Sequence, residues 1–320
     1  MINARTLALC AIAASAAVVA AQGYSSSGGK SVRWARNAQQ AIEQARKSKL
    51  PLMFFIEGDS RRRDQRLDDA RRKAFKDERV IYASRRFISA NVVRSDSRLR
   101  SLFAKLQVPA HANMMAVFAT PAGVKLDSFS AVHQPDTFAQ KMTLVFNAYR
   151  NRLFDDEIKA VLTDRKTKAA KLKKALKIIE KFDIVKADTD VIAALDRWKS
   201  DVAVSKQGFA ALAVLSTKPC VDYLFAKAAT GRHGQAAAAA LARCTPEAAE
   251  MMLPMLTGDD PDTMLLAYNT VTKICKVKKP KPDRFWTGKN ERLKKKELDR
   301  VRKTVERSAY RWKESYGRYR

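Results

Sequence analysis

The hydrophobic positions of residues 31–150 follow two patterns that alternate along the chain. Ala38, Ile42 and Ala45 recur at helical spacing, and basic residues follow them, as is common at a helix C-terminus. The segment 51–56 is instead a continuous apolar run of strand length, which is typical of a strand buried on both faces of a sheet. The pattern therefore predicts a first helix that leads into a central strand.

The same alternation predicts three more strands and three more helices. The strands are 87–93, 114–119 and 124–129, and the helices are 67–80, 99–106 and 136–149. The turn Thr120–Gly123 joins the last two strands, so we expect them to pair as a hairpin. Strands and helices in this order predict an α/β sandwich with a mixed sheet.

After Arg150 the pattern is helical to the end of the chain. A helix is predicted over 164–182, with an apolar stripe on one side and lysines and arginines on the other. Short paired helices follow over 208–215, 218–229, 235–243, 247–256 and 263–275, two of which have Pro219 and Pro246 in their first turn. The domain 151–277 therefore resembles a HEAT-type helical array, and a plain helical bundle remains the alternative. The surfaces of such arrays bind extended partners.

The last segment, 278–320, is a basic tail with 17 Lys and Arg against 6 Asp and Glu. An apolar stripe recurs in it at spacings of three and four, which predicts an amphipathic helix; its members are Leu298, Val301, Val305, Ala309, Trp312 and Tyr316. Three alternatives stay open: the tail docks on the helical domain, lies on an anionic membrane surface, or binds nucleic acid. The candidate binding residues are Lys294, Lys295, Lys296, Arg300, Arg311 and Trp312.

The first residues have the pattern of a secretory signal peptide. Arg5 supplies the positive charge, Thr6–Ala20 is an apolar stretch of the usual length, and small residues provide a cleavage site near Ala21. Residues 1–21 are thus expected to be a signal peptide and 22–30, rich in Ser and Gly, a flexible spacer. We expect the protein to be exported, to the periplasm or the medium.

Composition adds a strong positive charge to this picture. The chain has 62 Lys and Arg against 33 Asp and Glu, a net charge of +29 at pH 7, and 46% hydrophobic residues, as a folded protein has. Such a surface attracts anions, so the expected partner is a protein or an anionic molecule: nucleic acid, an anionic lipid surface or an acidic polysaccharide. The alternative is that the charge is spread over solvated helix faces and serves no single ligand. The oligomeric state does not follow from the sequence.

The order of blocks from Trp34 to Gly123 resembles the thioredoxin-like family. The blocks are Trp34, a helix, KLPLMFFIEGD, a helix ending near AFKDERV, RRFISANVVRSD, a helix ending in LQVPA, and MMAVFATPAG. The resemblance covers about residues 31–150 and implies a thioredoxin-like sandwich, followed here by an all-α helical-repeat or bundle region. In that family the turn after the central strand carries Cys-x-x-Cys, and a cis-proline precedes the third core strand. Here Asn113–Met114 occupies the place of that proline.

The turn after the central strand holds no cysteine, and none occurs between Cys10 and Cys220. Thiol–disulfide exchange needs a thiolate that attacks a disulfide, and arginine cannot replace it. The resemblance therefore implies a redox-inactive domain, and we expect no enzyme activity of this kind.

Arginines stand in this turn instead. Guanidinium groups beside the free N–H groups of a helix start hold phosphate, sulfate or carboxylate. The candidates for binding an anion or an acidic partner are Arg61, Arg62, Arg63 and Arg66. The alternative is a solvated loop in which Asp64, Asp68 and Asp69 neutralise the arginines locally.

No other set of residues predicts a catalytic or metal site. His111, His133 and His233 lie in different segments, and no pair of them has metal-ligand spacing. We therefore predict no metal and no cofactor. Outside the first segment the cysteines are Cys220, Cys244 and Cys275, which are expected to be buried thiols on helices, with a disulfide as the alternative.

The hypothesis from sequence is an exported, redox-inactive thioredoxin-like protein that acts as a binding or scaffolding module for a protein or anionic partner. The first alternative is a nucleic-acid or anionic-polymer binding protein that depends on the basic C-terminal region. The second alternative is a non-redox enzyme with a site near His111.

Overall fold

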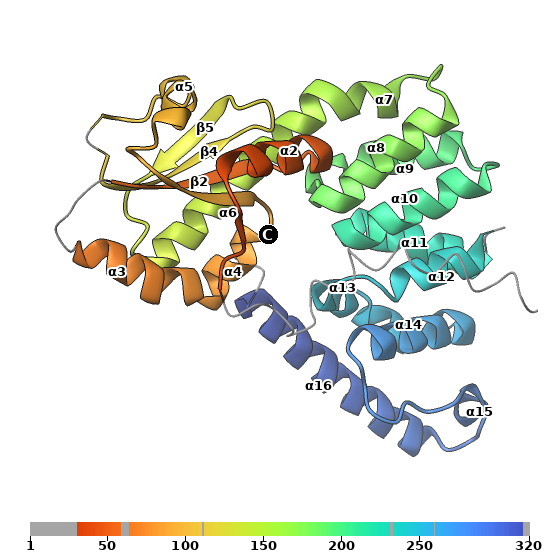
Figure 1. Cartoon of the computed structure of the whole chain (residues 1–320). Helices are drawn as coiled ribbons and strands as arrows, with labels where there is room; N and C mark the ends of the chain where they lie inside the picture. The colour runs from red at the N-terminus through yellow and green to blue at the C-terminus, as the bar shows by residue number, and fades with distance from the viewer. Residues whose placement is uncertain (1–30, 59–63, 111, 231–232, 259, 316–320) are drawn as a thin grey trace, which may run out of the picture. The chain divides into compact units, whose positions relative to one another are not determined.

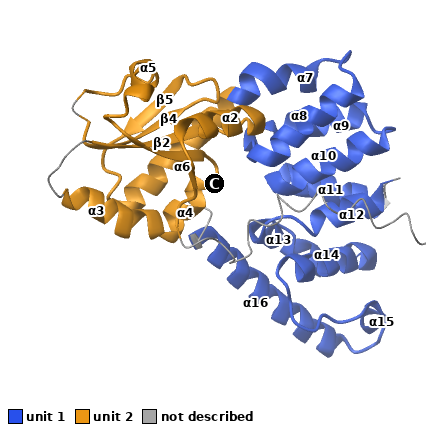
Figure 2. Cartoon of the chain, viewed as in Figure 1, with its two compact units in different colours: residues 1–25, 153–318 blue, residues 26–152, 319–320 orange. Residues whose placement is uncertain are grey.

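A computed structural model describes residues 31–58, 64–110, 112–230, 233–258 and 260–315. The signal segment and spacer, Arg61–Arg63 and His111 lie outside the described residues. The chain forms two compact units that divide between Arg152 and Leu153 (Figure 2). None of the described helices is long and apolar enough to cross a membrane.

The first unit is built around a five-stranded mixed sheet with the strand order β1-β3-β2-β4-β5 (Figure 1). β3 pairs in parallel with β1 and β2, whereas β4 is antiparallel to β2 and β5. The strands are β1 (Trp34–Ala35), β2 (Leu52–Glu57), β3 (Ile88–Val93), β4 (Met114–Ala119) and β5 (Lys125–Phe129). The predicted mixed α/β layout is thus confirmed, and the short edge strand β1 is an addition that the pattern did not reveal.

Helices cover both faces of this sheet (Figure 1). They are α2 (Ala38–Ser48), α3 (Gln65–Arg72), α4 (Glu78–Ser84), α5 (Arg100–Lys105) and α6 (Pro135–Leu153). On one face Phe54 and Ile56 of β2 share a core cluster with α2 and with Phe103 of α5. On the other face Phe55 meets Phe75 edge-on at 4.9 Å between ring centroids. Burial on both sides explains why the central strand reads as one continuous apolar run.

The second unit is helical throughout the part that the structure describes. After a π-helical turn (Phe154–Ile158) its helices are α7 (Lys159–Thr163), α8 (Ala169–Phe182), α9 (Asp188–Arg197), α10 (Val202–Leu215), α11 (Lys218–Thr230), α12 (Gly234–Leu241), α13 (Pro246–Met251), α14 (Pro261–Ile274), α15 (Asp283–Trp286) and α16 (Glu291–Ser315). α8 packs on α10, α11 on α12, and α13 on both α14 and α16. The predicted succession of helices is confirmed.

Two predicted helix starts were wrong, each for a local reason. Gly208 does not open a helix but lies inside α10, where a Cβ atom would come within 2.3 Å of Leu195 on α9. The expected helix at 164 begins only at Ala169, because the Asp164 side chain accepts hydrogen bonds from the Lys166 backbone and the Thr167 hydroxyl and holds a turn.

Candidate functional site

The carboxyl ends of β2 and β3 lie side by side, because these strands are parallel and Glu57 is paired with Val93. The chain leaves β2 at Gly58, whose N–H donates to the Asn113 carbonyl oxygen at 2.6 Å. A Cβ atom at position 58 would come within 2.6 Å of the Asn113 Cα, so only glycine fits this close approach. In open α/β sheets, ligands bind at the edge where parallel strands end.

A polar cluster occupies this edge. Glu57 is buried, at 7% exposed, and its two carboxylate oxygens each accept one hydrogen bond. Arg71 of α3 donates to Oε2 at 2.5 Å and Asn91 of β3 donates to Oε1 at 2.7 Å. A buried carboxylate needs such partners, because an unpaired charge in a protein interior is strongly unfavourable. The cluster fixes α3 to the end of the sheet.

The start of α3 is capped by Asp64, whose side chain accepts from the Arg66 backbone N–H at 2.9 Å. The Arg66 side chain is exposed, one turn before Arg71. Of the acidic residues that the alternative assigns to the arginines, Asp64 caps the helix and Asp69 forms an ion pair with Lys73 at 3.0 Å. Arg66 is therefore the one predicted anion-binding residue of this loop that the structure places, and it lies on the surface.

The described part of this edge offers binding groups and no nucleophile. It contains a paired carboxylate, an amide and arginines, whereas the sequence has no cysteine near it. Within the described residues, no three His, Cys, Asp or Glu side chains are grouped as a metal site. These side chains can form hydrogen bonds and ion pairs, whereas thiol chemistry would need a cysteine, which the sequence lacks here.

The three cysteines of the helical unit are free thiols. Cys220 and Cys244 are buried, and Cys275 is half-buried. Burial raises the pKa of the Cys275 thiol to about 11, although a hydrogen bond with Ser308 acts in the opposite direction. The expectation of buried thiols is confirmed for Cys220 and Cys244, whereas Cys275 is only half-buried.

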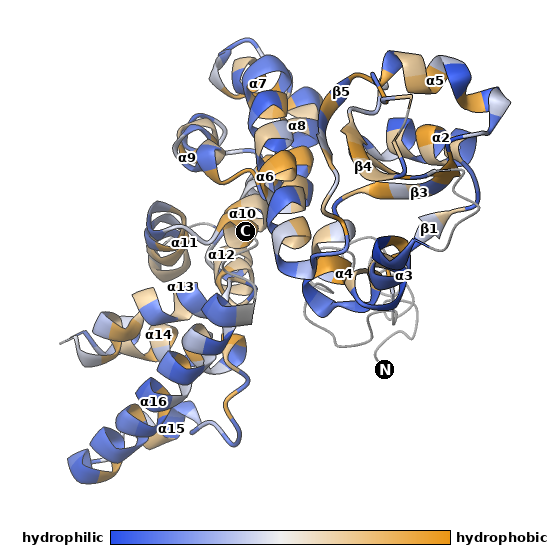
Figure 3. Cartoon of the chain, turned by 90° about the vertical axis from the view of Figure 1, so that its left-hand side faces the viewer, coloured by the Kyte–Doolittle hydropathy of each residue, from blue (hydrophilic) through white to orange (hydrophobic). Residues whose placement is uncertain are grey.

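The second candidate surface is α16, which Figure 3 shows as largely hydrophilic. Its apolar stripe is buried: Val301, Val305 and Ala309 are 0% exposed and Trp312 is 5% exposed. The stripe faces α13, on which α16 packs. Of the three alternatives for the tail, docking on the helical domain is therefore the one observed, and the apolar face is not available to enter a lipid layer.

The predicted tail residues divide into three groups. Lys295, Lys296 and Arg311 are exposed. Lys294 lies toward the buried side and pairs with Glu291 at 2.7 Å. Trp312 is buried in the helix contact, so it was wrong to expect its ring to stack on a ligand. Lys294 and Trp312 thus form the second group, and the third is Arg300 alone, which forms hydrogen bonds and an ion pair within the protein.

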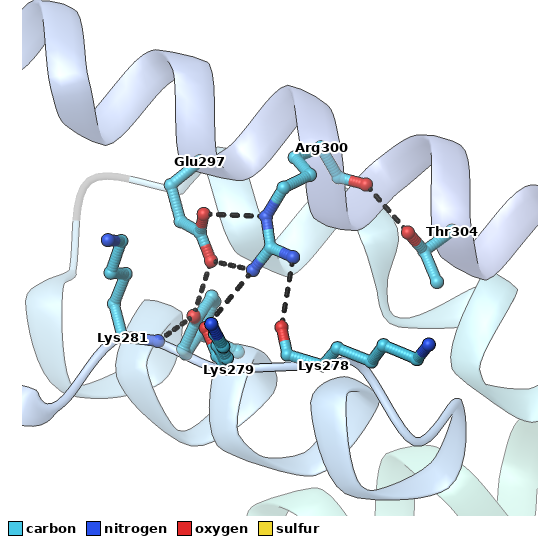
Figure 4. A network of polar contacts seen from close by, with 7 residues as sticks. Lys278, Lys279, Lys281, Glu297, Arg300 and Thr304 are labelled. Atoms are coloured by element: carbon cyan, nitrogen blue, oxygen red, sulfur yellow. Dashed lines mark hydrogen bonds and ion pairs between the residues drawn. The ribbon is translucent and has the colours of Figure 1, made fainter.

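Arg300 belongs to a polar network that sequence reasoning missed (Figure 4). Its guanidinium donates to both carboxylate oxygens of Glu297, at 2.6 and 2.8 Å. The Tyr268 hydroxyl of α14 donates to Glu297 at 2.7 Å and accepts the Lys281 backbone N–H at 2.6 Å. Tyr268, Glu297 and Arg300 are spread over 33 residues and form no sequence motif. Only the i, i+3 spacing of Glu297 and Arg300 on one helix could have indicated an ion pair.

Burial and charge shift the proton affinities in this network. Burial raises the pKa of Tyr268 to about 12, and the Glu297 carboxylate adds to that shift. Burial also opposes the ionisation of Glu297, but the hydrogen bonds from Arg300 and Tyr268 outweigh it and hold the pKa of Glu297 below its usual value. Glu297 therefore carries a charge that Arg300 balances, and neither group is spare for catalysis.

Comparison of the chain with protein-family models, with curated proteins and with solved structures found no match.

Proposed function

We propose that this chain is an exported, redox-inactive thioredoxin-like protein that binds a protein or anionic partner. The order of the strands and the helices on both faces of the sheet support the thioredoxin-like assignment. The pairing of successive helices in the second unit supports a HEAT-like scaffold. The signal-like first segment of the sequence supports export.

One observation carries the proposal. At the carboxyl end of β2, where the family's cysteines would act, a buried Glu57 forms an ion pair with Arg71 and accepts a hydrogen bond from Asn91. The polar groups of this cluster bond to one another and hold α3 against the sheet. Arg66 is exposed at the start of α3, and the sequence places Arg61, Arg62 and Arg63 just before that helix. The surface is suited to holding an acidic group.

The absence of thiol chemistry is tested by insulin reduction with dithiothreitol. We expect the full chain to precipitate insulin no faster than dithiothreitol alone, because the turn has no thiolate to offer. Catalysed turnover that disappears when all cysteines are replaced by serine would contradict the proposal.

Anion binding at the loop is tested with a fluorescein-labelled oligoglutamate peptide as a mimic of an acidic partner. Arg61, Arg62, Arg63 and Arg66 are replaced together by glutamine, and we expect anisotropy to show at least a tenfold weaker binding. The matched control removes four exposed basic side chains of the same unit, Arg33, Arg36, Arg46 and Lys47. Equal losses in both variants would show that net charge alone attracts the peptide.

A further inference from the structure

Four basic side chains follow one another along a single line of α16. Lys296, Arg300, Lys303 and Arg307 have the spacing i, i+4, i+7 and i+11, which places them on one side of a helix. The three that flank Arg300 are exposed, and among the described residues no ion pair joins them to an acidic side chain. We call Lys296, Lys303 and Arg307 the basic row. Arg311 extends the same line, so from Lys296 it spans roughly 22 Å at 1.5 Å per residue.

The Arg300 side chain stays partly exposed, and its guanidinium bonds to the chain before α15. Its Nη1 donates to the Lys278 carbonyl oxygen at 3.1 Å and its Nη2 to the Lys279 carbonyl oxygen at 3.5 Å (Figure 4). The Lys281 backbone N–H is held by Tyr268 in the same network. The segment 278–281 is thereby fixed beside α16 through its main chain.

The side chains of this segment remain on the surface. Lys278, Lys279 and Lys281 are exposed, and we call them the lysine strap. Because Arg300 lies in the middle of the line formed by the basic row, a strap tied to Arg300 runs next to that row. Two sets of cations that are separate in the sequence thus form one surface.

The acidic residues of α16 do not cancel this surface. Glu297 is buried and balanced by Arg300. Asp299 and Glu306 lie about 100–120° around the helix from Arg300, although Asp299 is four residues before Lys303 and Glu306 three after it, and Glu314 continues the line of the row. Exposed cations lie on that flank as well, at Lys295 and Arg302, so acidic residues offset the charge of the row only in part.

We propose that the basic row and the lysine strap together bind the sugar-phosphate backbone of a nucleic-acid duplex, without reading its sequence. The inference rests on the proposed function only in that the partner is anionic. A duplex carries one negative charge per about 1.7 Å, so a line of roughly 22 Å faces about a dozen phosphate charges, and counterion release favours binding. A lipid surface is the less favoured occupant, because the apolar stripe of α16 is already buried.

The proposal also assigns Arg300 a new role. It is a positioning residue, which places the strap, and it does not itself contact phosphate. Lys294 and Trp312 are left out of the site, because they lie on the buried side of α16.

The test is fluorescence anisotropy of a labelled 30-base-pair DNA duplex with the full chain over a series of KCl concentrations. Replacing Lys278, Lys279 and Lys281 by glutamine is expected to lower the slope of log K against log salt by up to about 2.7, three times the roughly 0.9 per phosphate contact. Replacing Lys296, Lys303 and Arg307 is expected to have an effect of the same size. The charge-matched control replaces Lys171, Lys174 and Lys177, which are exposed on α8, and is expected to leave the slope nearly unchanged.

The role of Arg300 is tested by a double-mutant cycle with the strap. Arg300→Ala is expected to weaken duplex binding in the parent chain and to have little further effect once the strap lysines are glutamine. An equal loss in both backgrounds would show that Arg300 contacts the phosphate directly and would overturn its positioning role. Far-UV circular dichroism of every variant verifies that the helical unit is intact.

Three outcomes would overturn the site itself. The α8 control could lose as much salt dependence as the two site variants, which would mean that only net charge matters. The chain could bind vesicles of anionic phosphatidylglycerol, or heparin, and not the duplex. The duplex could fail to bind at all. None of these results bears on insulin reduction or on the oligoglutamate assay, so a failure here is distinct from a failure of the proposed function.

Discussion

Arg71 of α3 and Glu57 of β2 form an ion pair with 2.5 Å between Nη2 and Oε2, at the edge of the sheet where the parallel strands β2 and β3 end. The Glu57 carboxylate is buried, whereas the Arg71 side chain is half exposed. The pair therefore joins the interior of the sheet to a surface helix. It holds the last turn of α3 against the ends of the strands.

Replacing Arg71 by alanine should destabilise the first unit by about 1–3 kcal/mol, because a buried carboxylate loses a charged hydrogen-bond donor. The measurement is hydrogen exchange of the β2 and β3 amides, which should lose protection. Arg72→Ala is the matched control, since Arg72 is the next residue of the same helix and is exposed. A surface change of this kind should stay within about 0.5 kcal/mol. Similar effects of the two substitutions would show that the ion pair adds nothing to the stability of the first unit.

The contact between Gly208 and Leu195 sets the spacing of α9 and α10. Gly208→Ala adds a Cβ atom 2.3 Å from a Leu195 methyl carbon. Alanine favours a helix over glycine by about 1 kcal/mol, but overpacking costs about 1–3 kcal/mol, so we expect net destabilisation of the helical unit. Thermal unfolding followed by circular dichroism measures it.

The control for Gly208 is a cycle with Leu195→Ala. The cavity left by Leu195 has room for the new methyl group, so the double variant should be more stable than the sum of the two single losses predicts. Simple additivity would mean that Leu195 does not limit the size of residue 208.

The sequence predicted those features that depend on neighbours in the chain. The strands β2 and β4 were found because burial on both faces leaves a continuous apolar run, and α16 was found from its repeating stripe. Gly208 was misplaced because glycine usually interrupts a helix, and only the packed Leu195 explains it inside one. Glu57 lies just beyond the predicted apolar run 51–56 and was not singled out, because its contacts with Arg71 and Asn91 join segments far apart in the chain.

The site at α16 was predicted only in part, because the sequence pattern shows features that depend on neighbours in the chain. Charge and periodicity identified Lys296 and Arg311 as exposed cations. Neither property reveals that Trp312 is covered by α13 or that Arg300 holds the Lys278 carbonyl oxygen, because these contacts join segments far apart in the chain. Long-range contacts of single residues leave no periodic signal.

Stability of the helical unit should fall as pH rises from about 10 to 12. The pKa of Tyr268 is raised by burial to about 12 in the folded protein, whereas an unfolded tyrosine releases its proton near pH 10. The stabilisation is therefore complete below pH 10 and is lost as pH rises through the folded value. In Tyr268→Phe this contribution is absent, so the gap between the melting temperatures of parent and variant should narrow with pH. A gap that is constant from pH 9 to 11 would contradict the assignment, and Tyr310→Phe, on the exposed side of α16, serves as the control.

Docking of α16 should depend on Trp312 and can be followed at Cys275. The Cys275 thiol contacts Ser308 of α16 and has a pKa raised by burial to about 11, so it should react slowly with iodoacetamide at pH 8. Trp312→Ala removes a buried aromatic side chain, which costs about 3–5 kcal/mol and should increase the population of undocked α16 by about a hundredfold or more. Peptide mapping of alkylated Cys275 measures the faster reaction. Tyr310→Ala is the matched control, because this aromatic side chain is 67% exposed two residues away on the same helix. If both variants accelerate alkylation equally, the Trp312 contact does not hold the helix, and the lysine strap would lack the fixed partner on which duplex binding depends.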